Sequence, residues 1–346
     1  MKLKDEAFFK LIRSFLTIYL PKQKCCSVNT TKSYKETLNL LLDYLQTEKQ
    51  IPLSQISFDH LNATTICSFL DWLQENRGCG VSTRNQRLAA LKSFIKYTGV
   101  MDCTYVALYA ELAKVPIKKE ASKIVKFLSE KAMEILLQQP SAGSKCGMRD
   151  RFFMILMYDT AARCGEMLSL RIKDIQLQPK GSMVYLTGKG TKMRVVPMMD
   201  KTVEHYRHYL DQFHPHLTRD SDDYLFYTTI HGVKNQMSPD NVASFMKRYG
   251  ELAKQSCPEI PDKVHPHQVR HTRAIHLYRG GMPMPLIAEF LGHADMSTSQ
   301  IYAYADTEMK RAAIQKADQK SNLVVPAEQP IWVNDDEMIR KLYGLK

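Results

Sequence analysis

The chain has 346 residues, of which 44% are hydrophobic, so it is too long for one small domain and can bury the cores of two. Lysine and arginine outnumber aspartate and glutamate by 48 to 36, and the resulting net charge of +12 favours a polyanionic partner such as a nucleic acid. None of the eight cysteines pairs at the two-residue gap of a zinc or redox motif, so we expect reduced thiols.

No segment is typical of secretion or membrane insertion. The longest strongly apolar run, residues 152–158, is far too short to span a bilayer. Asp5, Glu6 and several lysines and arginines interrupt the first twenty residues, which argues against a signal peptide. These features predict a soluble, cytoplasmic protein with no membrane partner.

The first third of the chain has the periodicity of helices. One helical face carries a stripe made of Tyr34, Leu38, Leu41, Leu42 and Leu45. Asn62 is a candidate N-cap of a second helix that ends before the glycines of 78–80. Ser82 is a candidate N-cap of a third helix that reaches Gly99, and a last helix is expected over residues 103–114.

A polar segment separates this region from the rest. Residues 115–122 contain Pro116 and a run of charges, which is typical of an exposed linker, so we place one domain at 1–115, a linker at 116–124 and a second domain at 125–346. The second domain is mainly helical, with one β-rich exception over residues 183–198. There two short runs flank a Gly-Lys-Gly turn, which predicts a hairpin with Lys189 at its tip.

Four segments of the second domain carry residue types suited to attack on a phosphodiester. The first is TAARCGEMLSL (160–170), in which Arg163 directly precedes a helix. Glu166, three residues further on, can hold this arginine rigidly for bidentate contact with a phosphate. In isolation the same pair would be an ordinary surface ion pair at i,i+3.

The second segment is VHPHQVRHTRAIHLYRGG (264–281), a helix that begins at Pro266 and ends at the glycine pair 280–281. One face of this helix carries four residues at i, i+3, i+4 and i+7: His267, Arg270, His271 and Ala274. A phosphate-binding arginine and a proton-transferring histidine would therefore be neighbours.

Two other interpretations of this helix stay open. His271 could be a histidine satisfied in the core, and His267 with His271 could hold zinc at i,i+4. The zinc reading is disfavoured because the hydrolytic motif needs a glutamate where this chain has Gln268. We expect no metal site.

The third and fourth segments adjoin in LIAEFLGHADMSTSQIYAYAD (286–306). A short helix ends at Gly292, so His293 follows its C-terminus, and Ser297 with Gln300 predicts a capping box that starts the next helix. Tyr302 lies in the second turn of that helix. Tyr304 lies on the opposite face, so only one of the two tyrosines can point into a shared site; alone, either could be a half-buried aromatic residue.

Together these segments resemble the tyrosine recombinase family, including its Xer and phage integrase branches. The resemblance rests on four motifs: TAARCGEMLSL, TGKGTKMRVVP, HPHQVRHTRAIHL and LGHADMSTSQIYAY. Tyr302 follows His293 by nine positions, as in the family pattern. It is strong over residues 125–315 and looser over 5–115. It implies a mostly α, two-domain fold, with an N-terminal helical core-binding bundle and a mainly helical catalytic domain that contains a small antiparallel β-sheet.

The resemblance also implies a site-specific DNA recombinase that cuts and rejoins strands without metal, ATP or another cofactor. Tyr302 would attack the phosphate and form a 3′-phosphotyrosine. Arg163 and Arg270 would clamp the non-bridging oxygens, and His293 would donate a further hydrogen bond. Lys189, with Lys192 as the alternative, would protonate the 5′ oxygen; His267 is the candidate base and Glu166 its supporting residue.

The resemblance implies double-stranded DNA at recombination sites as the partner. It also implies a tetramer, because the family assembles four subunits on two DNA segments. In the N-terminal domain the helix from Ser82 is our candidate for major-groove entry, with four candidate contacts: Arg84, Asn85, Arg87 and Lys92. A plain solvated helix face is the alternative. A C-terminal stripe through Leu342 and Tyr343 could pack on a neighbouring subunit or on its own domain.

Three other functions would account for some of these sequence features. A type IB topoisomerase would cleave and reseal one duplex with the same residue types. A non-catalytic DNA-binding regulator on the same fold would account for the charge, but it would not need Tyr302, Lys189 and both arginines. A metal-dependent nuclease is disfavoured because no carboxylates cluster near the histidine-rich helix.

Overall fold

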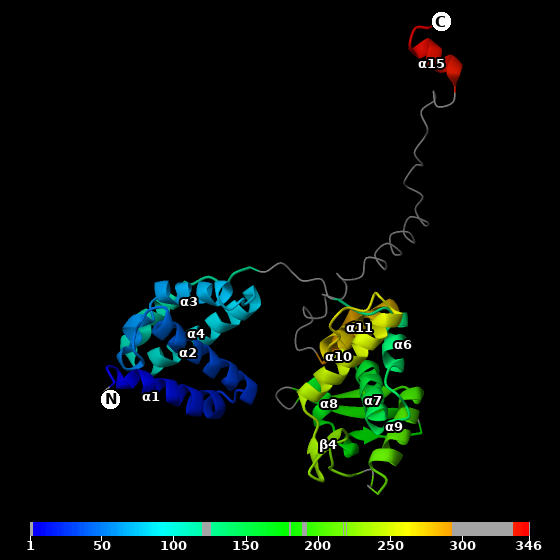
Figure 1. Cartoon of the computed structure of the whole chain (residues 1–346), viewed down its shortest axis with the longest axis horizontal. Coiled ribbons are helices and arrows are strands. Elements are labelled where there is room, and N and C mark those ends of the chain that lie inside the picture. Colours follow the sequence, from blue (N-terminus) through cyan, green and yellow to red (C-terminus); the bar gives the residue numbers. More distant parts are fainter. Residues whose placement is uncertain are drawn as a thin grey trace. The chain divides into compact units, whose positions relative to one another are not determined.

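The computed structural model describes residues 3–119, 126–179, 181–188, 192–216, 218, 220–292 and 335–345. The chain forms two compact units, unit 1 (Met1–Lys123) and unit 2 (Ile124–Lys346), and each is considered by itself (Figure 1). Within the described ranges, no helix combines the length and the apolar character needed to cross a membrane.

Unit 1 consists of helices around one apolar core. Its longer elements are α1 (Glu6–Ser14), the π-helical η1 (Phe15–Gln23), α2 (Val28–Thr47), α3 (Ala63–Glu75), α4 (Val81–Met101) and α5 (Val106–Ala113). Short 3₁₀ turns lie at Leu53–Gln55, Phe58–His60 and Cys103–Tyr105. Aromatic rings from distant segments meet in the core: the ring centroids of Phe15 and Phe94 are 5.3 Å apart and those of Phe8 and Phe58 are 5.0 Å apart.

The helix starts of unit 1 follow local capping signals in one case and not in another. The Asn62 side chain accepts a hydrogen bond from the amide of Thr65, as predicted for the N-cap of α3. The prediction that Ser82 caps α4 is wrong, because the helix begins at Val81 and its N-cap is Gly80. Glycine is an acceptable N-cap residue, although it offers no side-chain oxygen to the helix amides.

In its described residues, unit 2 combines helices with two small antiparallel sheets. Its helices are α6 (Glu130–Gln138), α7 (Lys145–Thr160), α8 (Cys164–Ser169), α9 (Asp200–Phe213), α10 (Pro239–Ser256), α11 (Pro266–Arg279), α12 (Met284–Leu291) and α15 (Asp336–Leu342), with a 3₁₀ turn at Ile172–Asp174. Its strands are β1 (Ile175–Gln176), β2 (Ser182–Thr187), β3 (Met193–Met198), β4 (Tyr227–Ile230) and β5 (Val233–Gln236). The mostly helical fold with a small sheet is therefore confirmed.

The predicted hairpin is present as β2 and β3, which pair antiparallel from Ser182 opposite Met198 to Thr187 opposite Met193. Its tip, residues 189–191, lies outside the described residues. Strand β1 adds a third member on the far side of β2. The sequence reading missed the second hairpin, β4–β5, whose two turn residues His231 and Gly232 both have positive φ (49° and 79°), as a tight hairpin turn requires.

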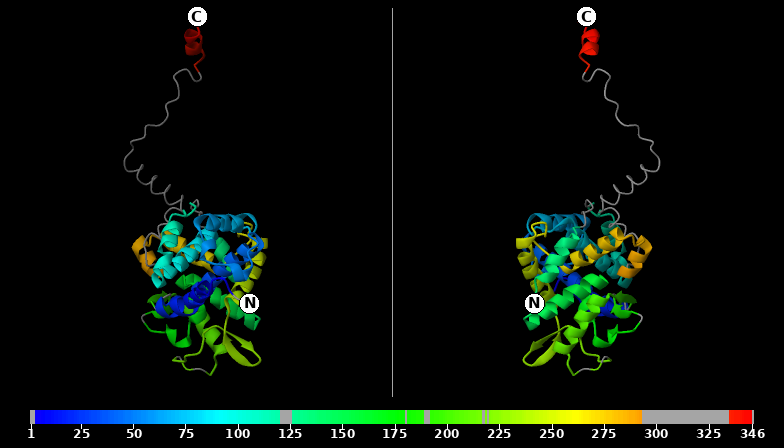
Figure 2. Two further views of the ribbon diagram at one scale, coloured as in Figure 1. Left: turned by 90° about the vertical axis from the view of Figure 1, so that its left-hand side faces the viewer. Right: turned by 90° about the vertical axis from the view of Figure 1, so that its right-hand side faces the viewer.

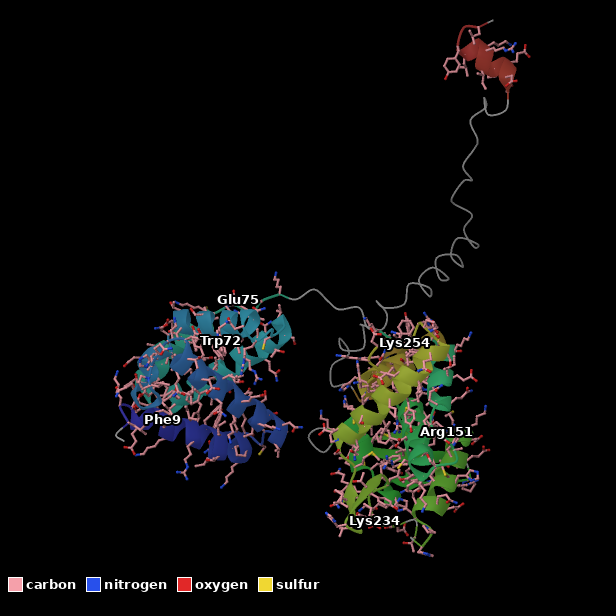
Figure 3. The ribbon with its side chains drawn as sticks, in the orientation of Figure 1. Phe9, Trp72, Glu75, Arg151, Lys234 and Lys254 are labelled. Atoms are coloured by element: carbon pink, nitrogen blue, oxygen red, sulfur yellow. The ribbon has the colours of Figure 1, made fainter. Side chains whose placement is uncertain are left out.

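Helix α7 holds unit 2 together, since it packs against α9, α11 and strand β3. A small separate cluster of fully or nearly fully buried apolar residues joins the end of α7 to α11 and α12: Ala161, Ala274, Ile275, Ile287 and Leu291. The β4–β5 hairpin lies toward one end of unit 2 and α11 toward the other in the views of Figures 1 and 2. Figure 3 marks these two ends with Lys234 on β5 and Lys254 on α10.

Candidate active site

Arg163 and Glu166 form the local unit that the sequence predicted. Arg163 is the N-cap of α8, and its backbone amide donates to Oε2 of Glu166 at 2.8 Å. Its Nη1 donates to Oε1 of the same carboxylate at 2.7 Å. Glu166 is 4% exposed, so the ion pair is buried on the glutamate side, whereas 36% of the Arg163 side chain remains exposed. This pair is not an ordinary surface ion pair.

A second arginine, which the sequence reading missed, holds the other side of Glu166. The Nη2 of Arg194, on β3, donates to Oε2 of Glu166 at 2.7 Å, and only 12% of the Arg194 side chain is exposed. A signal for this residue exists in the sequence. In a strand, residues two apart share a face, and Arg194 is in phase with the buried Val196 and Met198. An arginine on a buried face needs a partner.

Arg270, on α11, contacts the ends of α7 and α12. Its Nη1 donates to the carbonyl of Ala161 at 2.6 Å and its Nη2 to the carbonyl of Leu291 at 2.5 Å. Ala161 is the C-cap of α7 and has a φ of +47°, a left-handed conformation that favours glycine, so the chain turns sharply there. Arg270 is 3% exposed, so Arg163 is the more accessible of the two predicted phosphate ligands.

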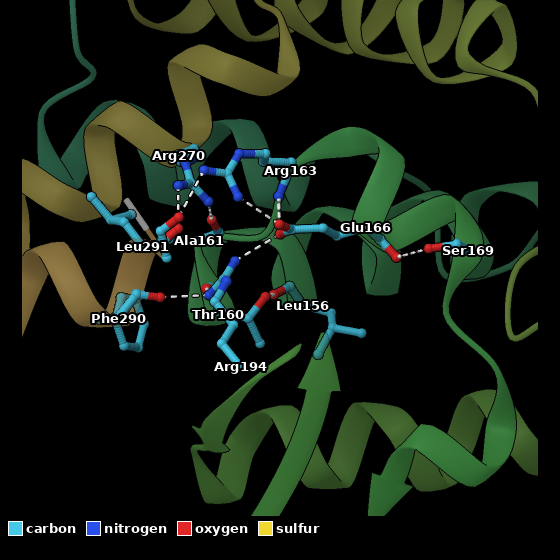
Figure 4. A network of polar contacts seen from close by, with 11 residues as sticks. Leu156, Thr160, Ala161, Arg163, Glu166, Ser169, Arg194, Arg270, Phe290 and Leu291 are labelled. Carbon is cyan, nitrogen blue, oxygen red and sulfur yellow. Dashed lines mark hydrogen bonds and ion pairs between the residues drawn. The ribbon is translucent and has the colours of Figure 1, made fainter. Parts of the chain in front are cut away.

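Three arginines from three elements thus hold consecutive carbonyls at the C-terminus of α12. Arg194 donates to the Phe290 carbonyl and Arg270 to the Leu291 carbonyl, both at 2.5 Å (Figure 4). Arg163 donates to the Gly292 carbonyl at 3.2 Å. The last carbonyls of a helix lack partners within the helix and carry partial negative charge. Guanidinium groups therefore satisfy and stabilise this helix end.

Four of the predicted residues lie outside the described residues: Lys189, His293, Tyr302 and Tyr304. Their chain neighbours Gly188 and Gly292 lie beside the arginine cluster, by which we mean Arg163, Arg194 and Arg270. A Cβ placed on Gly188 would be 3.2 Å from Oε1 of Glu166 and 3.8 Å from Nη1 of Arg163. Gly292 has a φ of +63°, and a Cβ placed there would lie 2.8 Å from Cδ of Arg194. The segments that lead into Lys189 and His293 therefore start beside Glu166 and Arg194.

The histidines of α11 have lowered basicity. Desolvation of the ring and the neighbouring His265, Arg270 and Arg163 lower the pKa of His267, although the residue as a whole remains exposed. Burial and the neighbouring His267, Arg270 and His265 lower the pKa of His271 to about 4. Both rings are therefore neutral near pH 7, and a neutral imidazole can accept a proton.

Glu166 stays ionised despite its burial. Burial raises the pKa of its carboxyl, but the charge of Arg194 and the hydrogen bonds from Arg163 and Arg194 outweigh that effect and leave the pKa below its ordinary value. Burial lowers the pKa of Arg194 in turn. Because the ordinary pKa of arginine lies above about 12, this side chain remains positive, and the site keeps a charged arginine–glutamate–arginine arrangement.

The four candidate DNA contacts of α4 all make hydrogen bonds within unit 1. The Nζ of Lys92 donates to the carbonyls of Ala113 and Val115, at 3.0 and 2.7 Å. Arg84 donates to the Pro116 carbonyl, and Asn85 makes two hydrogen bonds with the backbone of Lys118. Arg87 donates hydrogen bonds to three residues of α2: Ser33, Glu36 and Thr37. The sequence reading missed these internal roles. Contact of the four with DNA stays a prediction.

The same contacts bear on the predicted linker. Val115 is 5% exposed in the core of unit 1, and Lys118 bonds to Asn85 and pairs with Asp71 at 3.1 Å. Val115 is therefore buried, whereas residues 116–119 at the start of the predicted linker are exposed, with Ile117 at 68%, although Lys118 contacts unit 1.

Comparisons with protein families agree with the arrangement in both units. The phage integrase family model matches residues 126–309, which is more than half of the chain. The model of the phage integrase N-terminal SAM-like domain matches residues 12–98.

Individual relatives point the same way. The chain is 32% identical over 259 residues to the tyrosine recombinase XerA of Thermococcus kodakarensis, covering 74% of this chain and 82% of that protein. It is 29% identical over 302 residues to the tyrosine recombinase XerD of Listeria innocua, covering 85% and 93%. Its fold is similar to that of the XerH site-specific recombinase crystallised with a palindromic difH substrate, with a TM-score of 0.67 and 21% identity over 92% of this chain and 90% of the other. The chain therefore belongs to the phage integrase family, the tyrosine recombinases, which are enzymes of site-specific DNA recombination.

Proposed function

We propose that this recombinase cuts and rejoins DNA through a covalent 3′-phosphotyrosine, with Tyr302 as the nucleophile. The phenolic oxygen of Tyr302 attacks the scissile phosphorus and loses its proton, and the bond from phosphorus to the 5′ oxygen breaks. The 5′ oxygen leaves as a hydroxyl after taking up a proton. The phosphodiester energy is kept in the protein–DNA bond, so the reaction needs no ATP. It needs no metal because the arginines supply the positive charge that a metal ion would otherwise supply.

The observation that carries this proposal is the convergence of Arg163 and Arg270 on adjacent carbonyls of α12. Two guanidinium groups, from the N-cap of α8 and from α11, are held within one network, and 36% of the Arg163 side chain remains exposed. A guanidinium is a planar fork whose geometry matches two phosphate oxygens. Fixed positive donors are what a phosphorane-like transition state requires, because its charge develops on the non-bridging oxygens. The neighbouring His293 would add a further hydrogen bond.

Proton transfer is assigned to two other residues. We propose that Lys189 protonates the leaving 5′ oxygen, with Lys192 as the alternative, because a lysine at a hairpin tip is a flexible point donor. His267 is the candidate base for Tyr302, and its lowered pKa supports a neutral ring at pH 7. Glu166 supports the site by fixing Arg163.

We further propose that residues 1–115 form a core-binding domain that closes on the DNA opposite the catalytic domain, residues 125–346. The net charge of +12 supports a duplex DNA partner. Four subunits would assemble on two recombination sites. The C-terminal segment forms helix α15, as its apolar stripe predicted, and would take part in that assembly.

Trapping on a suicide DNA substrate tests the nucleophile. A substrate nicked close to the cleavage position loses a short fragment after attack, so the covalent protein–DNA adduct accumulates and is counted on a denaturing gel. We expect the wild-type chain and Tyr304→Phe to form the adduct and Tyr302→Phe to form none while still binding DNA. The reverse result for the two tyrosines would show that the nucleophile is misassigned.

Strand exchange is tested separately. Two labelled duplexes with the recombination site should yield Holliday junctions and recombinant products. A chain that forms the adduct and reseals one duplex, but never exchanges strands, would instead be a topoisomerase-like enzyme.

A further inference from the structure

Arg194 has no part in the reaction proposed above, yet its guanidinium group contacts three separate helices. Its Nη2 pairs with Oε2 of Glu166 at 2.7 Å, and its Nη1 donates to the carbonyl of Phe290 at 2.5 Å and, more weakly, to that of Thr160 at 3.4 Å. The three acceptors belong to α8, α12 and α7. One side chain thus joins three helices (Figure 4).

We propose that Arg194 is a positioning residue for strand cleavage: it fixes the Glu166 carboxylate and the C-terminal end of α12 relative to each other. This inference rests on the proposed function, because it assigns Arg194 a role in arranging the residues that act on the phosphate. Arg194 would act through Glu166, which orients Arg163, and through Gly292, which directly precedes His293.

The surroundings of Arg194 favour positioning over direct contact with DNA. Only 12% of its side chain is exposed, and both of its Nη atoms already donate to protein acceptors. Its backbone is held in β3, where it lies opposite Leu186 of β2. A guanidinium whose charge is paired with a buried carboxylate and whose backbone is held in a strand is suited to hold other groups in place.

Close packing at Gly292 makes the position of Arg194 matter for the next segment. A Cβ on Gly292 would lie 2.8 Å from Cδ and 3.1 Å from Nε of Arg194, so backbone and side chain are already in contact. If the guanidinium moved, the last turn of α12 would lose a carbonyl partner and its packing surface at once. A displacement of about 1 Å at a catalytic group can lower a rate about 10²-fold.

A purely structural role is the competing explanation, and the chain offers a matched control. Asp150 is a buried carboxylate, 1% exposed, that also lies between two arginines, Arg149 and Arg248. The Arg149 side chain is 16% exposed and contacts Asp150 at 2.8 Å, much as Arg194 contacts Glu166. Arg149→Gln therefore removes an equally buried arginine from a similar ion pair outside the arginine cluster.

The test compares Arg194→Gln, Arg194→Lys and Arg149→Gln in the full-length protein, at a temperature where circular dichroism shows each to be folded. Two quantities are measured for each variant: the dissociation constant for the recombination site, and the single-turnover rate of adduct formation at saturating protein. We expect Arg194→Gln to lower the rate about 10²-fold and to change the dissociation constant less than about threefold, because binding is spread over many phosphate contacts.

The conservative variant and the control complete the pattern. Arg194→Lys keeps the charge beside Glu166 but has one compact ammonium group in place of the planar fork that reaches three acceptors, so its rate should fall between the wild type and Arg194→Gln. Arg149→Gln should lose thermal stability to a similar degree and keep a near-wild-type rate. Equal rates for Arg194→Gln and Arg149→Gln would overturn the proposal.

A second substrate distinguishes a positioning role for Arg194 from a role in donating the proton. A 5′-bridging phosphorothiolate has a sulfur leaving group that needs no proton, so it should restore cleavage in Lys189→Ala but not in Arg194→Gln. Restoration of Arg194→Gln would also overturn the proposal, because the defect would then lie in proton donation from the hairpin. The wild-type reaction is run in parallel: if it forms no adduct, the proposed function fails, whereas the proposal for Arg194 fails only when the wild type reacts.

Discussion

Arg163 donates a hydrogen bond from Nη2 to the carbonyl oxygen of Gly292, 3.2 Å away and 129 positions later in the chain. This bond joins a predicted phosphate ligand to the residue that directly precedes His293. The remaining donors of Arg163 include Nη1, which holds Glu166 at 2.7 Å. The phosphate ligand, its carboxylate support and the start of the His293 segment therefore form one connected assembly, so a change in any of them should affect cleavage more than DNA binding.

Arg163→Lys and Arg270→Lys should each lose strand cleavage far more than DNA affinity. A lysine keeps the charge but loses the planar fork that matches two phosphate oxygens and, in this protein, also holds an α12 carbonyl. Loss of one such donor typically lowers a rate about 10²–10³-fold, whereas affinity is spread over many phosphate contacts. A gel-shift titration beside a cleavage assay separates the two quantities. Parallel losses in both would mark these arginines as ordinary backbone contacts.

Cleavage should persist in EDTA. In the proposed mechanism Arg163, Arg270, His293 and Lys189 supply the charge and the proton that metal ions supply in other phosphoryl-transfer enzymes. The measurement is adduct formation after dialysis against the chelator, compared with an untreated sample. A loss of activity that magnesium or zinc restores would contradict the mechanism.

Short-range signals account for most of what the sequence predicted correctly. Asn62, Pro266 and Gly292 mark helix ends through capping chemistry that depends on a few neighbouring residues, and the structure has these ends. The β4–β5 hairpin was missed because its strands are short and its turn is His231-Gly232, without the Asn or Asp that usually precedes glycine in such a turn.

The rest depends on contacts between distant segments. The arginine cluster around α12 joins residues 163, 194 and 270 to carbonyls at 290–292, and carbonyls carry no side-chain signature in a sequence. For the same reason Lys92 and Arg84 had the pattern of an exposed basic face, although backbone carbonyls of residues 113–116 accept their hydrogen bonds. The hydrophobic periodicity of a sequence does not show which carbonyls in distant segments will accept hydrogen bonds.

Glu166→Gln should destabilise the protein by about 3–5 kcal/mol, because it leaves two guanidinium groups without their buried counter-charge. The pKa of Glu166 is lowered in the folded state, so its contribution is fully present above the unfolded value of about 4.3 and is lost as the pH falls through the folded value. The difference in thermal stability from wild type should be constant from about pH 6 to 8 and shrink below about pH 4.

The control for this prediction is Glu251→Gln. Glu251 is exposed and lies 3.9 Å from Lys247, so its loss should change the free energy of unfolding by less than about 0.5 kcal/mol. A Glu166→Gln protein as stable as this control would show that the buried ion pairs contribute nothing net.

Lys92→Gln should weaken unit 1 without changing the salt dependence of DNA binding. Its Nζ is committed to two backbone carbonyls, and removal of such hydrogen bonds lowers stability by about 1–2 kcal/mol. A lysine that contacts a DNA phosphate instead changes the slope of log K against log salt concentration by about 0.9. Lys96, which is exposed on the same helix, is the comparison. A reduced slope for Lys92→Gln would restore Lys92 as a DNA contact.

Gly292→Ala should impair both stability and cleavage, because two separate constraints require glycine there. Its φ of +63° is left-handed, which disfavours any residue with a Cβ by about 1–2 kcal/mol, and the new Cβ would lie 2.8 Å from Cδ of Arg194. Gly78→Ala isolates the first constraint, since Gly78 has a φ of +62° and nothing within 4 Å of the added atom. Both variants should lose thermal stability from backbone strain.

Only Gly292→Ala should also displace Arg194 and the turn that leads into His293, and so slow adduct formation at saturating DNA. The decisive comparison is the single-turnover cleavage rate of the two variants, each measured well below its unfolding temperature. If Gly292→Ala cleaves as fast as Gly78→Ala, the contact between Gly292 and Arg194 has no bearing on catalysis, and the positional coupling argued for the end of α12 is wrong.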